Sequence, residues 1–122
     1  MIIIATDAPL NSQQLQRLAK RAPLALGRTG SSMSNGSGDY VIAFSSSREV
    51  RIRSTDPKIQ STPRIREDDL SPFFQAVVEA TEEAIGNSLL RATTVKGYRG
   101  TEVEAVPIEA VRDAMRKYGK IK

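Results

Sequence analysis

The chain has 122 residues, 39% of them hydrophobic and 26% charged, and it contains no cysteine and no histidine. This size fits one domain, or part of one, over residues 1–122, and the two missing residue types exclude disulfides, thiolate zinc sites and a Ser-His-Asp triad built from this chain alone. The net charge of +4 is scattered and accompanies three Phe, three Tyr and no Trp, which argues against a nucleic-acid partner. No apolar run approaches the roughly 18 residues of a membrane span, and the N-terminus turns polar too soon for a signal peptide, so we expect a cytoplasmic protein without membrane contact.

Residues 2–5 predict the first strand, buried on both faces, because β-branched side chains form a continuous apolar run there. Asn11 and Gln14 make a capping-box pattern that begins a helix. The apolar face of that helix comprises Leu15, Leu18, Ala19, Ala22 and Leu26. Pro23 is expected to kink the helix near its end, and Gly30 is one of two glycines able to stop it.

The middle of the chain alternates loops with one more strand. Residues 27–39 are rich in Gly, Ser and Asn and predict a loop. Residues 40–44 predict a second buried strand. Residues 45–66 predict a long exposed loop, within which the alternation at residues 50–53 allows an edge strand.

The last third of the chain predicts two helices. Ser71 and Pro72 are typical of a helix start and precede a stripe of about twenty residues. A turn bounded by glycines follows at residues 97–100, and a final helix begins at Pro107 and ends at Gly119. The order of elements predicts an α/β fold, and because two strands alone make no stable sheet, the chain is expected to belong to something larger.

The loop residues Asn35, Gly36, Ser37, Gly38 and Asp39 are the candidates for chemistry. On an extended segment, residues two apart point to the same side, so the Ser37 hydroxyl and the Asp39 carboxylate can meet. A carboxylate that accepts from a serine hydroxyl orients it and makes it a better proton acceptor, which suits acyl transfer without histidine.

Other interpretations of these residues stay open. Asn-Gly and Ser-Gly are ordinary turn pairs, so the loop can be a simple tight turn. Glycine-rich loops also bind phosphate, although the lysine of a P-loop is absent here. Asp7 follows the first strand and can be catalytic or part of a local turn. The carboxylates of Glu79, Glu82 and Glu83 predict a solvated helix face rather than a metal site.

Several segments in order resemble one family, the self-processing aminopeptidases. These segments are ATDAPL, QLQRLAKRAPLALGRTG, NGSGDYVIAFS, EATEEAIGNSLLRATTVKGYRG and VEAVPIEAVRDAMRKYG. The family includes the L-aminopeptidase/D-esterases and the β-peptidyl aminopeptidases, and the resemblance is to its C-terminal β-subunit. Only residues 45–66 look unlike it.

The resemblance implies a four-layer α-β-β-α sandwich similar to N-terminal-nucleophile hydrolases. It also implies a precursor that cuts itself in front of a serine, which then becomes the nucleophile and forms an acyl-enzyme. Ser37 would hydrogen-bond that nucleophile and relay its proton. Asp39, where the family often has Glu, would orient Ser37 and help hold the substrate's ammonium group, while Asn35, Gly36 and Gly38 would shape the loop.

The resemblance also implies partners. The nucleophilic serine would stand immediately or very shortly before the strand at residues 2–5, where this chain has Met1, so this chain alone is expected to be inactive. An α-subunit portion would complete the site, the substrate would be a peptide, amide or ester with a free N-terminal amine, and the protein would be oligomeric. No cofactor or metal is expected. The alternatives are a non-catalytic binding or assembly subunit of the same fold and, last, a small basic nucleic-acid-binding protein whose affinity falls steeply with salt.

Overall fold

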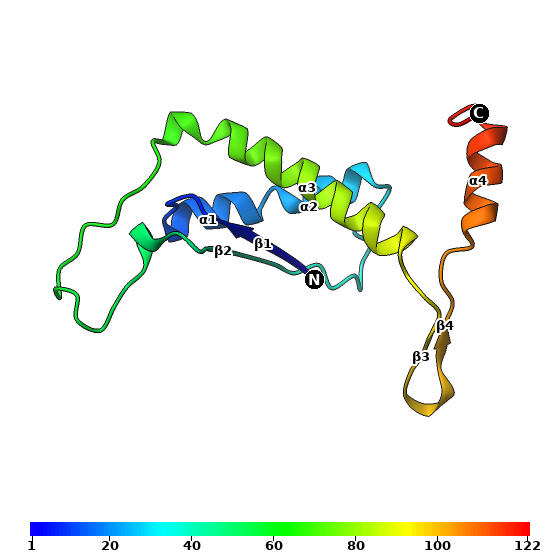
Figure 1. The fold of residues 1–122 in the computed structure, drawn as a ribbon, viewed down its shortest axis with the longest axis horizontal. Coiled ribbons are helices and arrows are strands. Elements are labelled where there is room, and N and C mark those ends of the chain that lie inside the picture. Colours follow the sequence, from blue (N-terminus) through cyan, green and yellow to red (C-terminus); the bar gives the residue numbers. More distant parts are fainter. The chain divides into compact units, whose positions relative to one another are not determined.

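The structure, a computed structural model, describes residues 1–122 and divides into two compact units, Met1–Glu83 and Ala84–Lys122 (Figure 1). Both helices and strands are present, which confirms the α/β class. The expectation of a single domain over residues 1–122 stays a prediction. The first unit contains both predicted strands and the candidate loop, and it is described first.

Two parallel strands form the sheet of the first unit. Strand β1 (Ile2–Thr6) pairs with β2 (Val41–Ser45) in a register that sets Ile2 opposite Val41 and Thr6 opposite Ser45. Parallel strands need a crossover connection, and helices α1 (Ser12–Ala19) and α2 (Ala22–Arg28) provide it. Both strand predictions are therefore confirmed in position, and β1-α1-α2-β2 forms one βαβ unit.

The predicted burial of the strands on both faces is wrong for this chain. The side chains of Ile2, Ile4 and Val41 pack against the helices, whereas those of Ile3 and Ile42 are 60% and 53% exposed. Helices α1, α2 and α3 lie on one face of the two strands, and nothing else in the first unit covers the other (Figure 1). A continuous apolar run predicts that both faces of a strand are buried, but the helices of the first unit bury only one face.

The single helix predicted from residue 11 is two helices. The capping box is confirmed, because the Asn11 side chain accepts from the Gln14 backbone N–H at 2.9 Å while the Gln14 side chain accepts from the Asn11 N–H at 3.3 Å. Helix α1 ends at Ala19, and Pro23 lies in the first turn of α2 rather than kinking a longer helix. A proline is tolerated at that place because its missing N–H has no helical acceptor there.

Gly30 ends α2, as predicted, through its backbone conformation. Its φ is +99°, and the N–H of Ser31 donates to the Leu26 carbonyl at 3.0 Å across the last turn. This is the Schellman arrangement, in which a left-handed residue, usually Gly, lets the chain fold back over the helix end. The chain then enters the candidate loop.

The core of the first unit lies between the helices and the sheet. Helix α3 (Ser71–Leu90) begins at the predicted Ser-Pro pair and has the predicted length of 20 residues. The fully or nearly buried core side chains are Leu10, Leu18, Ala22, Leu70 and Val77. These residues come from α1, α2, α3 and the segments before α1 and α3, so the core fixes the helices over the strands.

A buried glutamine joins α1 to the start of α3. The side-chain amide of Gln14 is completely buried and donates to the Ile65 carbonyl at 2.7 Å and to the Glu67 carboxylate at 2.9 Å. Arg17 forms an ion pair with the same Glu67, and the guanidinium of Arg21 lies 3.8 Å from the ring centre of Phe74. These contacts fix the end of the loop that leads into α3 against α1.

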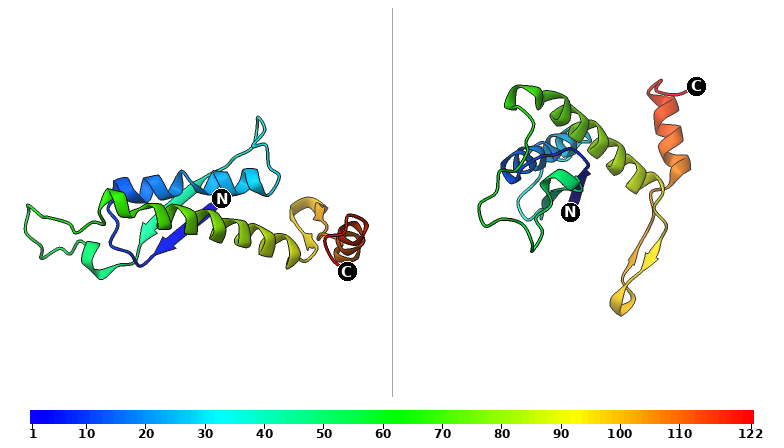
Figure 2. Two further views of the ribbon diagram at one scale, coloured as in Figure 1. Left: turned by 90° about the horizontal axis from the view of Figure 1, so that it is seen from above. Right: turned by 60° about the vertical axis from the view of Figure 1, so that its left-hand side comes forward.

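The loop between β2 and α3 contains no strand. Short 3₁₀ turns η1 (Arg48–Val50) and η2 (Glu67–Asp69) lie at its two ends, and the edge strand allowed at residues 50–53 is absent. The backbone turns there instead, because the Asp56 carboxylate accepts from the Arg53 N–H at 2.7 Å. Figure 2 shows this loop, in green, extending away from the helices of the first unit.

The second unit contains the end of α3, a hairpin and a final helix. Strands β3 (Val95–Lys96) and β4 (Glu102–Val103) are antiparallel and enclose the turn η3 (Tyr98–Gly100), which confirms the predicted turn. Helix α4 (Ile108–Lys117) begins after Pro107 and is ended by Gly119, whose φ is +65°, also as predicted. No residue of this unit is buried.

Candidate active-site loop

The candidate loop contains a tight turn immediately before Ser37. The backbone N–H of Ser37 donates to the Ser34 carbonyl at 2.9 Å, with Asn35 and Gly36 between them. Gly36 has a φ of +91°, a conformation that side-chain-bearing residues rarely adopt. The backbone therefore forms the tight turn predicted at Asn35 and Gly36. This turn sets the direction of the chain at Ser37.

The Ser37 hydroxyl donates a hydrogen bond to the Asp39 carboxylate. Both residues are exposed, and Gly38 between them has the ring of Tyr40 3.4 Å from the place a Cβ would occupy. The structure therefore brings together the two side chains that the spacing predicted. Because its proton is directed at Asp39, the Ser37 oxygen is left with lone pairs that can accept from another hydroxyl.

The loop delivers this pair to the edge of the sheet where β1 begins. The N–H of Ile2 donates to the Tyr40 carbonyl at 2.8 Å, and Ile2 lies opposite Val41 in the parallel register. Parallel strands start at the same edge, so the residue before Ile2 and the residues before Val41 are neighbours (Figure 1). Asp39 is two residues from that point of pairing.

Tyr40 is the neighbour that sequence reasoning missed. Its carbonyl connects the loop to β1, and its ring, 70% exposed, lies beside Gly38. The available signal was its position directly after Asp39, as the first residue of the strand predicted at residues 40–44. Its backbone contact required knowledge of the strand pairing, which periodicity does not supply.

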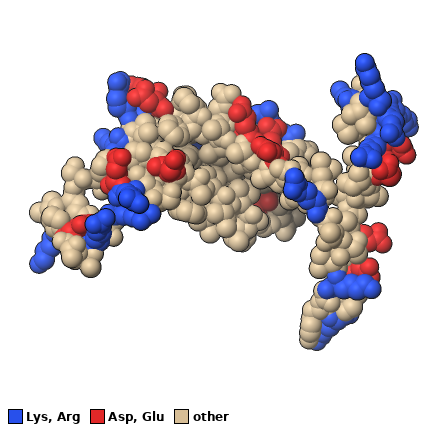
Figure 3. Space-filling view, viewed as in Figure 1, with Lys and Arg blue, Asp and Glu red and all other residues tan.

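The carboxylate of Asp39 has no cationic partner in this chain, because no ion pair includes it. The chain's excess of positive charge lies elsewhere. Residues 45–66 contain six Lys and Arg and two Asp and Glu, a difference of +4 that equals the charge of the whole chain. Figure 3 shows basic side chains on this loop, in blue at the left. Asp39 is thus available to a cationic ligand.

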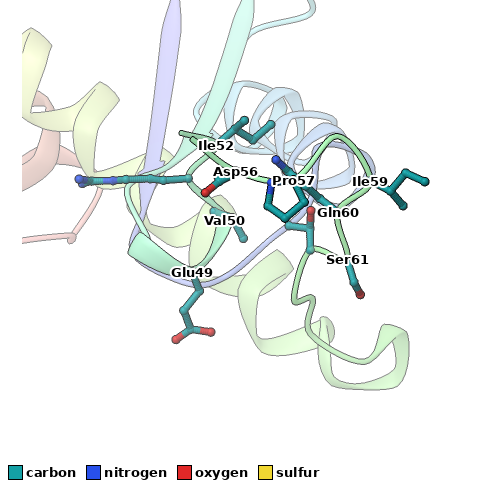
Figure 4. Close-up of a pocket in the computed structure, with 10 residues that line it drawn as sticks. Glu49, Val50, Ile52, Asp56, Pro57, Ile59, Gln60 and Ser61 are labelled. Atoms are coloured by element: carbon teal, nitrogen blue, oxygen red, sulfur yellow. The ribbon is translucent and has the colours of Figure 1, made fainter. Parts of the chain in front are cut away.

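The same long loop contains a hollow of about 300 Å³. Glu49, Val50, Arg51, Ile52, Asp56, Pro57, Ile59, Gln60, Ser61 and Thr62 line it (Figure 4). This loop follows the end of β2, whereas Ser37 and Asp39 precede its start, so the hollow and the serine-carboxylate pair lie at opposite edges of the sheet.

The other acidic candidates lie away from Ser37. Asp7 follows β1 and so lies at the opposite edge of the sheet from Asp39. Glu82 forms an ion pair with Arg28 at 3.0 Å, and Glu79 accepts from Gln75 at 2.7 Å on the surface of α3. No group of three or more acidic side chains is arranged to hold a metal ion.

Comparison with known proteins identifies the family. The profile of peptidase family S58 matches residues 1–103. The chain belongs to peptidase family S58. Both predicted strands, the candidate loop and α3 fall inside the matched residues, so the S58 resemblance rests on the part of the chain that forms the candidate site.

Two curated relatives are β-peptidyl aminopeptidases. The chain is 39% identical over 121 residues to the enzyme of Sphingosinicella microcystinivorans, covering 99% of this chain and 30% of the relative. It is 35% identical to the enzyme of Sphingosinicella xenopeptidilytica, covering 95% of this chain and 29% of the relative. The chain therefore spans about a third of the length of these relatives.

Solved structures agree on the fold. A Pyrococcus horikoshii protein superposes with a TM-score of 0.83 at 45% identity, covering 97% of this chain and 33% of that one. The L-aminopeptidase D-Ala-esterase/amidase of Ochrobactrum anthropi, described as a variant of the Ntn hydrolase fold, superposes with a TM-score of 0.82 at 32% identity, covering 99% of this chain and 34% of that one. This S58 chain thus has the fold of a portion of those proteins. None of its helices is long and apolar enough to cross a membrane.

Proposed function

We propose that this chain is the β-subunit-like part of a self-processing serine aminopeptidase. The observation that carries the proposal is the hydrogen-bonded pair of Ser37 and Asp39 at the sheet edge where β1 begins. In the family that the sequence resembles, the nucleophilic serine stands just ahead of this strand. A serine there would be a neighbour of the pair through the contact of Ile2 with Tyr40.

The proposed reaction is acyl transfer in two steps. The serine oxygen attacks the carbonyl carbon of the substrate's N-terminal residue, and the serine's proton passes by way of the Ser37 hydroxyl to the leaving amine. The carbon–nitrogen bond breaks, the amine leaves and an ester to the serine is formed. Water then hydrolyses the ester, which releases the amino acid and restores the serine hydroxyl.

Ser37 and Asp39 have different tasks in this scheme. The carboxylate of Asp39 accepts a hydrogen bond from the Ser37 hydroxyl, so the Ser37 oxygen can accept from the nucleophile's hydroxyl. Asp39 also lacks a cationic partner within the chain, which suits a role in binding the ammonium group of the substrate. The substrate class is a peptide, amide or ester with a free N-terminal amine.

The partner in this proposal is the α part, by which we mean the portion of the protein that the family has in addition to the segment matched here. The relatives are about three times as long as this chain, which supports such a partner. The exposed strand face formed by Ile3, Ile42 and Phe44 supports it too, because a second sheet layer would bury these side chains. The family's higher oligomers are proposed here as well.

The test uses the complete protein purified from its source cells or expressed from its full coding region. Ser37→Ala should lower kcat/KM for an aminoacyl p-nitroanilide by about 10²–10⁴, the usual contribution of a proton-transfer group. Asp39→Asn should lower it as well, since an amide can donate to Ser37 and no longer orients its proton. Ser32→Ala is the matched control, because the Ser32 hydroxyl makes no hydrogen bond in the same loop.

Mass spectrometry of the polypeptide termini decides the rest. A serine at the N-terminus of the segment that begins β1, with a companion α chain, is the expected result. A protein with no such serine, or one in which Ser37→Ala and Ser32→Ala are equally active, contradicts the proposal. The absence of that serine would favour the alternative of a non-catalytic binding or assembly subunit with this fold.

A further inference from the structure

Helix α4 has one apolar face that nothing else in the second unit, Ala84–Lys122, covers. The side chains of Met115 and Tyr118 are 39% and 71% exposed, and Ile108 is 36% exposed. A ten-residue helix with large exposed apolar side chains on one side gains little from folding alone, because short isolated helices are marginal in water. The surface therefore needs a partner to account for its composition.

The apolar side chains of α4 follow the spacing of a packed helix. They recur at steps of three, four and three residues, namely Ile108, Val111, Met115 and Tyr118. This spacing keeps them on one stripe. Ala114 lies beside the stripe, and Val111, Ala114, Met115, Tyr118 and Lys120 line a shallow hollow of about 390 Å³.

The opposite face of α4 is charged, and four of its side chains form ion pairs. Glu109 and Arg112 form an ion pair at 2.8 Å, and Asp113 and Arg116 form another at 3.0 Å. In each pair the two opposite charges lie about one helical turn apart, and both side chains are exposed to solvent.

We propose that the apolar face of α4 is the surface that holds the α part of the same protein. This inference rests on the proposed function, in which an α part accompanies this chain. The decisive observation is length: two solved proteins match 97–99% of this chain, yet this chain covers only 33–34% of them. Two thirds of such a protein therefore lie outside this chain and can cover the stripe.

A second copy of this chain is the weaker occupant. A stable dimer buries about 800 Å² on each partner, and one face of a helix roughly 15 Å long falls well short of that. A partner within the same protein needs less area, because the rest of the fold already holds it nearby and the effective concentration is high.

The experiment measures association rather than activity. In the complete processed protein with a purification tag on this chain, Met115→Glu places a charge in the middle of the stripe. The amount of α part that co-purifies should fall about tenfold, the effect of losing a single well-buried contact. Ala110→Glu introduces the same side chain, with the same change of charge, at an exposed position on the charged side of the helix and should leave co-purification within about twofold.

Native mass spectrometry separates the outcomes. An intact αβ pair that no longer forms the larger oligomer would assign the stripe to a second copy and overturn the proposal, and so would an unchanged complex or a chain purified without any companion. If Met115→Glu fails to accumulate, hydrogen exchange on the unsubstituted protein decides: α4 amides should be protected in the complex and exchange freely when this chain is alone. Equal exchange would overturn the proposal.

The proposed function can fail separately. A protein in which Ser37→Ala leaves peptidase activity unchanged would sink the catalytic scheme, yet the co-purification of the α part would still report on α4.

Discussion

The two units of the chain use amphipathic helices in different ways. In Met1–Glu83, the apolar face of α1 is covered, and Leu18 is only 2% exposed. In Ala84–Lys122, the apolar face of α4 is open, and no residue is buried. Both helices have clear apolar stripes. A stripe therefore predicts which face of a helix is buried in the complete protein, but it does not identify the segment that buries it.

The first unit also satisfies its buried polar groups by itself. Gln14 is completely buried, and its side chain contacts the Asn11 backbone, Ile65 and Glu67. No buried side-chain nitrogen or oxygen lacks a hydrogen-bond partner. Such self-sufficiency is what a packed folding unit requires, and it leads us to expect cooperative unfolding of residues 1–83.

The largest expected difference between the units concerns apolar side chains. In the 122-residue chain, Leu18→Ala should lower the free energy of unfolding by about 2–5 kcal/mol, because it leaves a cavity in the core. Met115→Ala should change it by less than about 0.5 kcal/mol, because that side chain lies on the surface. Urea denaturation followed by far-UV circular dichroism measures both. Equal effects would mean that the stripe of α4 is covered within this chain.

A smaller difference is expected from two neighbouring glutamines of α1. Gln14→Leu removes the donor of the Ile65 carbonyl and half of the capping box, which should cost about 1–3 kcal/mol of unfolding free energy. Gln13→Leu is the control, because Gln13 is exposed and makes no side-chain hydrogen bond. The same urea titration applies, and a Gln14→Leu chain as stable as the control would show that the buried amide contributes nothing net.

Much of the local structure could be predicted from the sequence because local rules determine it. The capping box at Asn11 and the terminating glycines Gly30 and Gly119 all lie where the pattern placed them. The break between α1 and α2 was missed, since Pro23 was interpreted as a kink although a proline suits a first helical turn equally well. Burial of the strands was overestimated, because cover is a tertiary property.

In the candidate site, too, local features could be predicted from the sequence and tertiary features could not. The two-residue spacing predicted that Ser37 and Asp39 would meet, and the hydrogen bond between them agrees. The neighbourhood of the pair depends on the parallel register of β1 and β2, which joins residues almost forty positions apart. No periodicity within a single segment contains that information, so the role of Tyr40 became visible only in the structure.

The smallest expected difference in stability is between alanine substitutions at two glycines that each end a helix. Gly30 and Gly119 both have positive φ at a helix end, and an added Cβ would meet no atom within 4 Å at either place. The cost of Gly→Ala is therefore purely conformational, about 1–2 kcal/mol at each site. Gly30→Ala should appear at full size in the urea transition, because α2 carries the fully buried Ala22 and Ala25 and so unfolds with the core. Gly119→Ala should leave that transition in place and increase amide exchange only in the last turn of α4, because local fraying there uncovers no core. If both variants shift the urea transition equally, the second unit unfolds together with the first. The two units would then differ in how exposed their helices are, but not in stability.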